Sequence, residues 1–273
     1  MTRRILSRSL VYVALILAAA FFLLPIYLML LTGVKPFNQV DLKTMWSIPT
    51  SIHFENFVAA YKQLAPNIKN SFMLVIPEAI LSSLVGSLNG YLLSKWRFRH
   101  SNLIFSLILF GMFIPYQSIL IPLVKFMDFV QLYGGIPGLV LVHIIYGIPI
   151  TTLIFRNYYA GISTEVLEAG RIDGASLMGL YRFIILPLSG PSFAVVIIWQ
   201  FTQAWNDFLF ALILTNQSFW PVTVALNNLA GSQLVQWNVL MAATLLAALP
   251  TLLVYLFLGK FFVRGLMAGS LKG

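Results

Sequence analysis

The sequence predicts an all-α integral membrane protein with six transmembrane helices. Hydrophobic residues make up 59% of the 273 residues and charged residues only 9%, whereas soluble domains carry about 25% charged residues. The mean hydropathy is +0.89. Several apolar stretches exceed the length of about 18 residues that marks a transmembrane helix. These spans must be helices, because isolated strands would leave backbone groups unpaired in lipid.

Six apolar segments are bounded by charges, by proline and glycine, or by polar clusters. The expected spans are residues 10–34, 71–94, 103–124, 139–155, 191–215 and 239–262. At a rise of about 1.5 Å per residue, most of them cross a hydrocarbon core of about 30 Å, and the fourth is the shortest. The first follows three arginines like a signal peptide, but its apolar run is much longer than an h-region of about 7–15 residues. We therefore expect an uncleaved first span and one membrane domain over residues 1–273.

Lysine and arginine are unevenly divided between the two sides of this topology. With the N-terminus inside, the cytoplasmic segments hold 12 of the 17 basic residues. The positive-inside rule therefore places both termini in the cytoplasm. The net charge of +9 is spread between the spans and does not indicate nucleic-acid binding. The extracytoplasmic stretch of residues 35–70 contains Pro36, Pro49 and Pro66 among aromatic residues, and we expect a folded cap there.

The sequence contains no recognisable catalytic or metal-binding motif. It has no cysteine, no phosphate-binding loop, and three histidines in three different segments, so we expect neither catalytic residues nor a metal site. Uphill transport would need another chain or an ion gradient to drive it. The acidic residues well inside the spans are Glu78 and Asp207, which we expect in the outer third, within reach of water or headgroups. That placement does not favour an ion-coupled carrier.

Residues 163–176 predict a short helix, a break and the start of another helix in a cytoplasmic loop. Ser163 or Thr164 can cap the first helix, Gly174 suits a positive φ after its end, and Ser176 can cap the second helix. The polar face carries Glu165, Glu168 and Arg171, and the small residues Ala169, Gly170 and Ala175 would let another surface approach closely. Two interpretations stay open, a solvated interfacial helix pair or a knob that fits a cleft on a cytoplasmic partner.

The same loop resembles the EAA loop of ABC importer permeases. The resemblance rests on Glu168-Ala169-Gly170, Asp173-Gly174-Ala175 and Ile185-Leu186-Pro187-Leu188. It extends over essentially the whole chain, through segments that include Lys35-Pro36, Asn56-Phe57, Ile114-Pro115 and Trp205-Asn206-Asp207. The tail of residues 265–273 resembles the ending of the maltose-type sugar permease subunit that pairs with a larger sister. Two positions depart from the pattern, because Gly170 replaces an alanine and Ser163-Thr164 replaces a proline.

This resemblance implies a permease subunit of a binding-protein-dependent importer for a sugar or oligosaccharide in a bacterial or archaeal cytoplasmic membrane. It implies three partners, which are a second permease subunit in a heterodimer, a cytoplasmic ATPase dimer that binds ATP and Mg, and an extracytoplasmic sugar-binding protein. This chain itself would bind no cofactor. The implied ATPase-coupling residues are Glu168, which would form a salt bridge to the ATPase, and Ala169, Gly170, Asp173, Gly174 and Ala175. The tail after Arg264 would reach the ATPase dimer interface.

A sugar path needs polar groups for hydroxyls and aromatic faces for the C–H surface of the ring. Candidates within the spans are Gln117, Tyr146, Trp199, Gln203, Trp205, Asn206 and Asp207, with Glu78 as a further residue. Gln203, Asn206 and Asp207 would share one face of a continuous helix. Such a polar stripe faces either a cavity or a neighbouring helix, and both remain open. Trp205 could instead anchor the helix at the membrane interface.

Three other functions compete with sugar import. One is an ABC permease for another solute, such as amino acids or polyamines, against which the tail argues. The second is an ion-coupled secondary carrier, which the lack of inverted repeats and midplane charges disfavours. The third is a membrane scaffold without transport activity, which leaves the polar residues of the fifth span unexplained.

Overall fold

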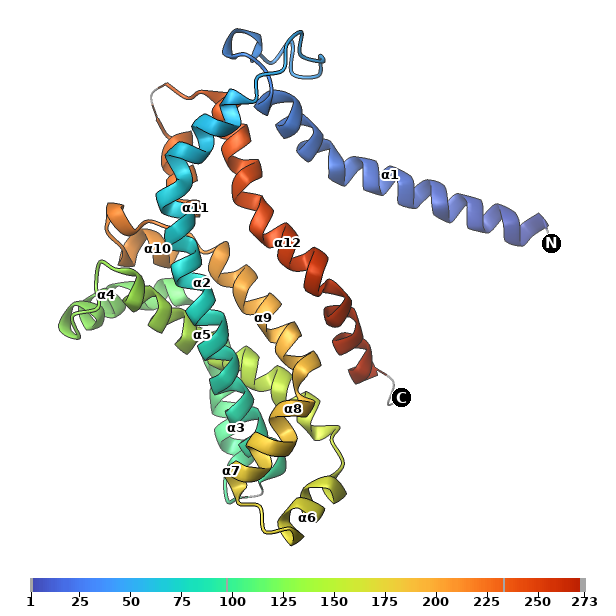
Figure 1. Ribbon diagram of the computed structural model, residues 1–273, viewed down its shortest axis with the longest axis vertical. Helices are drawn as coiled ribbons and strands as arrows, with labels where there is room; N and C mark the ends of the chain where they lie inside the picture. The colour runs from blue at the N-terminus through green and yellow to red at the C-terminus, as the bar shows by residue number, and fades with distance from the viewer. Residues whose placement is uncertain (1, 97, 233, 271–273) are drawn as a thin grey trace. The chain divides into compact units, whose positions relative to one another are not determined.

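A computed structural model describes the backbone of residues 2–96, 98–232 and 234–270, and the side chains of residues 8–96, 98–232 and 234–261. Over this part of the chain the structure is helical and contains no strand, which confirms the all-α fold class (Figure 1). The chain forms two compact units. Unit 1 comprises Met1–Ala65 and Leu226–Leu249, and unit 2 comprises Pro66–Ala225 and Pro250–Gly273.

Four helices in the described part of the chain are long and apolar enough to cross a membrane. They are α1 (Thr2–Gly33), α2 (Glu55–Lys95), α5 (Ile136–Ala160) and α12 (Trp237–Ser270). Two bent pairs pass the same test, Ser101–Phe113 with Tyr116–Phe129 at 87° and Leu177–Leu188 with Gly190–Trp205 at 77°. Six spans result if each bent pair counts as one, in agreement with a polytopic membrane protein.

Two expected boundaries differ from the observed helices. Helix α2 begins at Glu55 and runs for 41 residues, so the second half of the expected cap is helical and contains Pro66. Helix α5 has 25 residues and is therefore not the short segment that residues 139–155 suggested. In both helices a proline lies inside the run, and membrane helices tolerate this because neighbouring groups satisfy the freed carbonyl.

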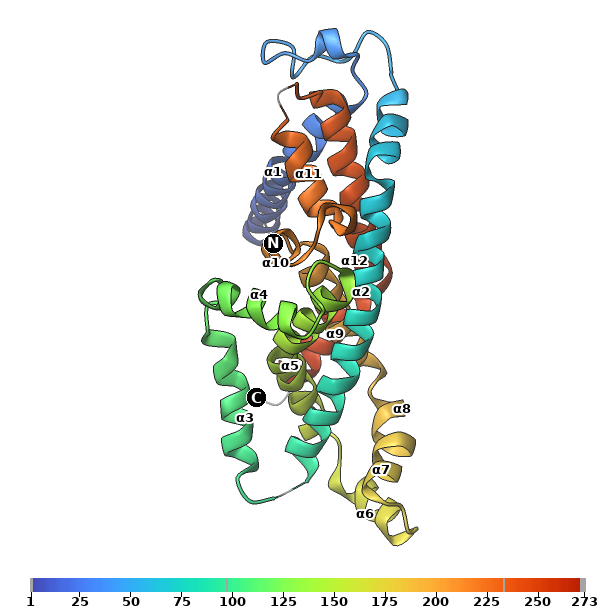
Figure 2. The same cartoon turned by 90° about the vertical axis from the view of Figure 1, so that its left-hand side faces the viewer.

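The expected span of residues 103–124 is not one helix. Helix α3 (Ser101–Phe110) continues into η2 (Gly111–Phe113), and the chain resumes as η3 (Tyr116–Ile119) and α4 (Leu120–Phe129). Figure 2 shows the resulting bend between α3 and α4. The break lies at Ile114-Pro115, where Ile114 is extended with φ −76° and ψ 116°. Proline has no N–H and disfavours the helical conformation of the residue before it, so this sequence ends the helix.

The expected span of residues 191–215 is also interrupted. Helix α9 (Gly190–Trp205) ends before Asn206, and α10 (Leu209–Leu214) begins two residues after Asp207. The Asp207 carboxylate accepts hydrogen bonds from the backbone N–H groups of Phe210 at 3.4 Å and Ala211 at 2.9 Å. The Asn206 amide donates to the Thr202 carbonyl at 2.9 Å. Asp207 thus satisfies N–H groups that the start of α10 leaves unpaired, and the chain is not helical at residues 206–208, so a helical face shared by residues 203, 206 and 207 does not form.

Unit 1 contains a buried lysine at the end of α1. Lys35 is 1% exposed, and its amine donates to the carbonyls of Thr44 at 2.7 Å and Met45 at 3.2 Å. The Asn56 amide donates to the Gly33 and Lys35 backbone carbonyls, both at 2.9 Å, and the Asn238 amide donates to the Asn56 side-chain Oδ1 at 3.1 Å. Burial lowers the pKa of the Lys35 amine. This network ties the start of the stretch of residues 35–70 to the first residues of α2 and α12.

In unit 2, small residues bring α2 and α5 close together. The facing positions are spaced four residues apart and are Ser82, Gly86 and Gly90 on α2 and Gly147, Thr151 and Phe155 on α5. A Cβ on Gly90 would lie 2.6 Å from the Phe155 Cβ and 2.7 Å from the Arg156 nitrogen. Small residues at such spacing allow membrane helices to pack at close backbone distance.

Candidate functional site

The predicted coupling loop folds around helix α6 (Thr164–Ile172), whose two ends are capped. The Ser163 hydroxyl accepts a hydrogen bond from the Glu165 N–H at 3.2 Å. At the other end, Gly174 has φ +83°, its N–H donates to Arg171, and the Ala175 N–H donates to Gly170. These two bonds form a Schellman motif. The expectations for the cap and for the positive φ of Gly174 are confirmed.

A second short helical segment follows α6 and leads into α9. It comprises α7 (Leu177–Leu180), a π-helical turn over Tyr181–Ile185 and α8 (Leu186–Leu188). The Ser176 hydroxyl accepts from the Gly179 N–H at 3.1 Å and caps α7, as predicted. The segment then bends by 77° into α9, close to Ser189. The loop therefore leads directly into α9, the helix that ends at the break before Asn206.

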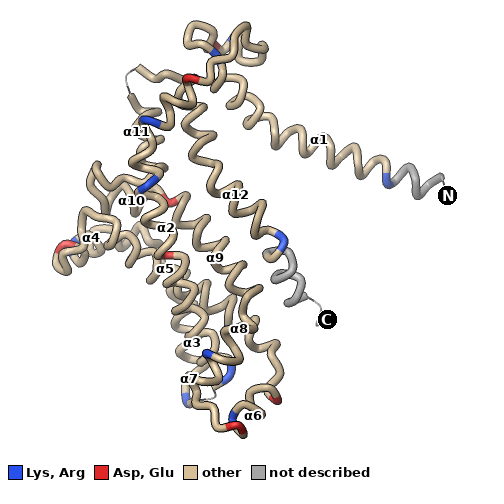
Figure 3. The backbone as a smooth tube through the Cα atoms, in the orientation of Figure 1, with Lys and Arg blue, Asp and Glu red and all other residues tan. Residues whose placement is uncertain are grey.

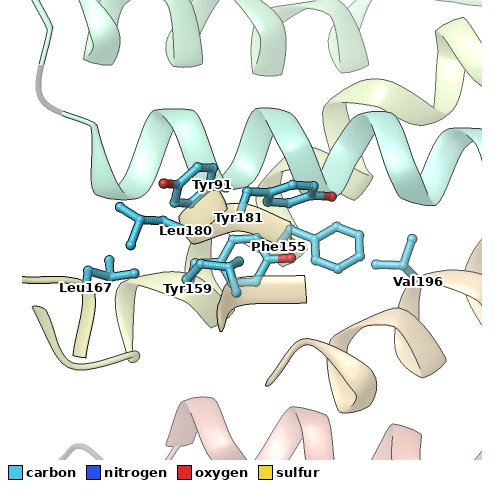
Figure 4. Packing of buried hydrophobic residues seen from close by; sticks show 8 residues of the cluster. Tyr91, Phe155, Tyr159, Leu167, Leu180, Tyr181 and Val196 are labelled. Carbon is cyan, nitrogen blue, oxygen red and sulfur yellow. The ribbon is translucent and has the colours of Figure 1, made fainter. Parts of the chain in front are cut away.

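One face of α6 is held against the neighbouring helices of unit 2 by an anchor cluster of buried residues. The anchor cluster consists of Tyr91, Phe155, Tyr159, Leu167, Leu180, Tyr181, Ile185 and Val196. Figure 4 shows Leu167 of α6 beside Leu180 and the tyrosine rings. A Cβ on Gly170 would lie 2.7 Å from the side-chain ends of both Leu180 and Ile184. The glycine that departs from the EAA pattern therefore allows α6 to lie close to these side chains.

The opposite face of α6 is exposed and carries the predicted coupling residues. Glu168, Ala169, Asp173 and Gly174 are exposed, whereas Gly170 is buried and Ala175 is half-buried. Ile172 is 86% exposed, so an apolar side chain lies next to the acidic ones. Within unit 2, charges of both signs gather at α6 (Figure 3). Among the described side chains, no lysine or arginine forms a salt bridge with Glu168.

We expect Gly174→Ala to weaken the turn after α6 by about 1 kcal/mol, because a left-handed conformation is unfavourable for residues with a Cβ. Nothing lies within 4 Å of the added Cβ, so the loss would come from backbone strain alone. Gly174→Asn should lose less, because asparagine tolerates positive φ. Hydrogen exchange of residues 163–176 measures the difference, and equal exchange rates in the wild type and the alanine variant would contradict it.

The predicted sugar-path residues do not form one group. Gln117, Trp199, Gln203 and Asn206 are exposed in this chain. Trp205 is 2% exposed and stacks on Phe201 with ring centroids 5.5 Å apart, so it is a core residue and not an interface anchor.

Glu78 is also not where we expected it. It is 1% exposed and its Oε1 accepts a hydrogen bond from Gln200 at 2.7 Å, so water does not reach it. Gln200 also donates to Ser82 at 2.8 Å, directly beside Gly147. The expectation failed because α2 begins 16 residues before the expected span, so that Glu78 lies well inside the helix. The group therefore joins α2, α5 and α9 in the packed interior.

Tyr146 and Asp207 belong to one cluster of contacting side chains, which we call the junction. Its residues are Tyr116, His143, Tyr146, Asp207 and Phe210. The Tyr116 ring centroid lies 5.0 Å from that of Phe210, and the Tyr146 centroid lies 5.1 Å from it. His143 Nε2 is 3.4 Å from Asp207 Oδ2. Sequence reasoning missed Tyr116, His143 and Phe210, and the available signal was the proline before Tyr116 together with the helix-ending Asn206-Asp207.

Comparison with known proteins places the chain in a transport family. Residues 82–267 match the family model described as "Binding-protein-dependent transport system inner membrane component". A probable ABC transporter permease protein of Pyrococcus horikoshii is 45% identical, and the match covers 98% of this chain and 98% of that protein. The xylose/arabinose import permease protein of Haloferax volcanii is 35% identical, with 96% and 92% covered.

A solved structure supports the same fold. It is a chain of a bacterial ABC transporter involved in the import of the acidic polysaccharide alginate, with a TM-score of 0.83 and 22% sequence identity over 96% of this chain and 98% of that one. At this identity the likeness concerns the fold alone. Together with the capped loop and the membrane helices, these matches show that the chain belongs to the family of inner membrane components of binding-protein-dependent transport systems.

Proposed function

We propose that the protein is the permease subunit of an importer for a sugar or a short oligosaccharide, and that it forms half of the translocation path. Family membership supports transport, and the xylose/arabinose permease that shares 35% identity supports a sugar cargo. The observation that carries the mechanism is the rigidly anchored α6 with an exposed acidic face. A helix capped at both ends and packed on the anchor cluster can transmit a displacement to the membrane helices.

The expected partner at α6 is an ATPase dimer that binds ATP and Mg, since the chain has no phosphate-binding loop. In the topology favoured by the positive-inside rule, α6 faces the cytoplasm. Glu168 would form a salt bridge with a basic residue in a cleft of the ATPase, and Ile172 would contribute apolar contact. The tail after Arg264, which we expect to reach the ATPase interface, lies outside the residues whose side chains are described.

Two further partners complete the proposal. A second, different permease subunit would form a heterodimer with this chain. An extracytoplasmic sugar-binding protein would dock on unit 1. A cavity of about 270 Å³ in this unit is lined by Gln63, Leu229, Ser232, Leu234, Val235, Gln236, Val239 and Leu240. Gln63 belongs to the stretch of residues 35–70 that we expected to contact the binding protein.

Co-purification and uptake test this function. The tagged chain should bring down an ATPase with a G-x-x-x-x-G-K-[ST] sequence and a second permease from its native membrane. In proteoliposomes that also contain the binding protein, the complex should take up labelled xylose, arabinose or glucose only with ATP. Accumulation of sugar by the purified chain alone, without nucleotide, would overturn the proposal and favour a carrier.

A further inference from the structure

We propose that the junction is a contact site for an uncharged sugar and that His143 supplies its hydrogen bond to a sugar hydroxyl. This proposal rests on the sugar-import function above. It adds three residues that sequence reasoning did not single out, Tyr116, His143 and Phe210.

The first argument is the position of the junction at two interrupted helices. Tyr116 directly follows the break at Ile114-Pro115, and Phe210 lies in the first turn of α10, after the break at Asn206-Asp207. Their ring centroids are 5.0 Å apart. Both breaks lie inside segments that the sequence predicts to cross the membrane. Non-helical backbone at membrane depth is tolerated where it is buried in protein or lines a cavity, and discontinuous helices commonly form the binding sites of transporters.

The second argument is the chemistry of the side chains. Sugar rings have apolar C–H faces that pack on aromatic rings, and hydroxyl groups that need hydrogen-bond partners. The rings of Tyr116, Tyr146 and Phe210 lie within 6.5 Å of one another. The His143 ring meets Phe210 edge-on, with centroids 5.9 Å apart. The junction thus combines three aromatic rings with one imidazole and one carboxylate.

The third argument is that His143 has an unsatisfied nitrogen. Its Nε2 atom is buried and forms no hydrogen bond within the described residues, and the side chain is 10% exposed. Asp207 Oδ2 lies 3.4 Å away, which is ion-pair distance, but the two side chains form no hydrogen bond. Buried polar atoms normally have partners, so an unpaired nitrogen beside three aromatic rings is a candidate ligand for a hydroxyl. A neutral imidazole nitrogen can donate to or accept from a hydroxyl.

The charge of the site selects the class of sugar. The Asp207 carboxylate lies 3.4 Å from the proposed ligand nitrogen. An anionic sugar such as a uronate would meet like-charge repulsion in a poorly solvated site, whereas a neutral pentose or hexose would not. The junction therefore favours uncharged sugars.

The test measures sugar uptake and ATP hydrolysis in the same proteoliposomes, with the complete complex, the binding protein, and labelled xylose, arabinose and glucose as probes. We expect His143→Ala to lower sugar uptake at least tenfold while binding-protein-stimulated ATPase activity stays within twofold of wild type. His143→Gln, whose amide can still reach a hydroxyl, should recover part of the uptake. The matched control is His100→Asn, because His100 is exposed and adopts φ +72°, which asparagine tolerates.

Unchanged uptake in His143→Ala would overturn the site while leaving the sugar-import function in place. A wild-type complex that takes up none of the three sugars would overturn the function itself. An equal loss of uptake, ATPase activity and assembly in both His143 variants would show that His143 holds α5 and α10 together. In that case the Tyr116→Leu variant tests the sugar site. Tyr116 is 36% exposed, and its substitution should reduce uptake without loss of assembly; unchanged uptake would overturn the site.

The class of sugar has a separate readout in the same vesicles. Glucuronate should not compete with neutral sugar uptake in the wild type. Asp207→Asn, which removes the charge and keeps an acceptor oxygen for α10, should admit such competition. Effective competition by glucuronate in the wild type would contradict the preference for uncharged sugars.

Discussion

Glu168→Lys is expected to abolish transport, with uptake at least a hundredfold below wild type and no stimulation of ATP hydrolysis by the binding protein. Glu168 is exposed on a helix that is capped by Ser163 and anchored through Leu167, so the substitution changes a charge without disturbing the fold. Reversal of a charge at a desolvated contact replaces an attraction with a repulsion and costs several kcal/mol. The measurement is uptake and ATPase activity of the complex in proteoliposomes.

The matched control is charge removal at two positions of the same helix. Glu165 and Glu168 are both exposed, but Glu165 lies in the first turn and accepts a hydrogen bond from Ser163. Glu165→Gln should leave transport nearly unchanged, whereas Glu168→Gln should lower it at least tenfold. Normal transport together with normal ATPase stimulation in Glu168→Lys would remove the basis for the coupling proposal.

Gly90→Ala should strongly destabilise the protein, although it adds a single methyl group. The new Cβ would lie 2.6 Å from the Phe155 Cβ and 2.7 Å from the Arg156 nitrogen, and the latter belongs to the backbone of α5. Helix α5 would have to move away from α2. Overpacking of this kind costs about 1–3 kcal/mol, and because the clash is with the backbone of α5 we expect the upper end of this range, which exceeds the gain of about 1 kcal/mol in helix propensity.

Gly259→Ala is the control for this prediction. Gly259 lies in α12, and a Cβ there would have nothing within 4 Å. Its replacement should raise the thermal midpoint of the purified complex slightly or leave it unchanged, whereas Gly90→Ala should lower it by several degrees. Equal midpoints for the two variants would contradict the close packing of α2 on α5.

Local features of the predicted coupling loop could be derived from the sequence because they depend on residues close together in the chain. Ser163, Gly174 and Ser176 act on backbone groups one to three positions away, so their residue types suffice to place the caps and the turn. The interruption at Pro115 was within reach of the same reasoning, since proline lacks an N–H. It was missed because the apolar run around Ile114 continues on both sides, and hydropathy alone does not register a missing hydrogen bond.

The path residues illustrate the opposite case. Gln203, Asn206 and Asp207 share a face only if the helix continues, and the side chains of Asn206 and Asp207 instead satisfy backbone groups at the helix ends. The burial of Glu78 depends on Gln200, which lies 122 positions further along the chain. The hydrophobic periodicity of a single segment does not predict a hydrogen bond between two distant helices.

The sequence by itself determined that this is a helical membrane protein of the transport family, because hydropathy, charge asymmetry and short capping motifs are properties of contiguous residues. The tertiary structure alone decided that α6 is fixed by its contacts with the anchor cluster, that glycines set the distance between α2 and α5, and that His143 meets Phe210 and Asp207. The physical reason is that these contacts join residues far apart in the chain. Which of these residues come together depends on how closely the helices pack, and local sequence patterns do not contain that information.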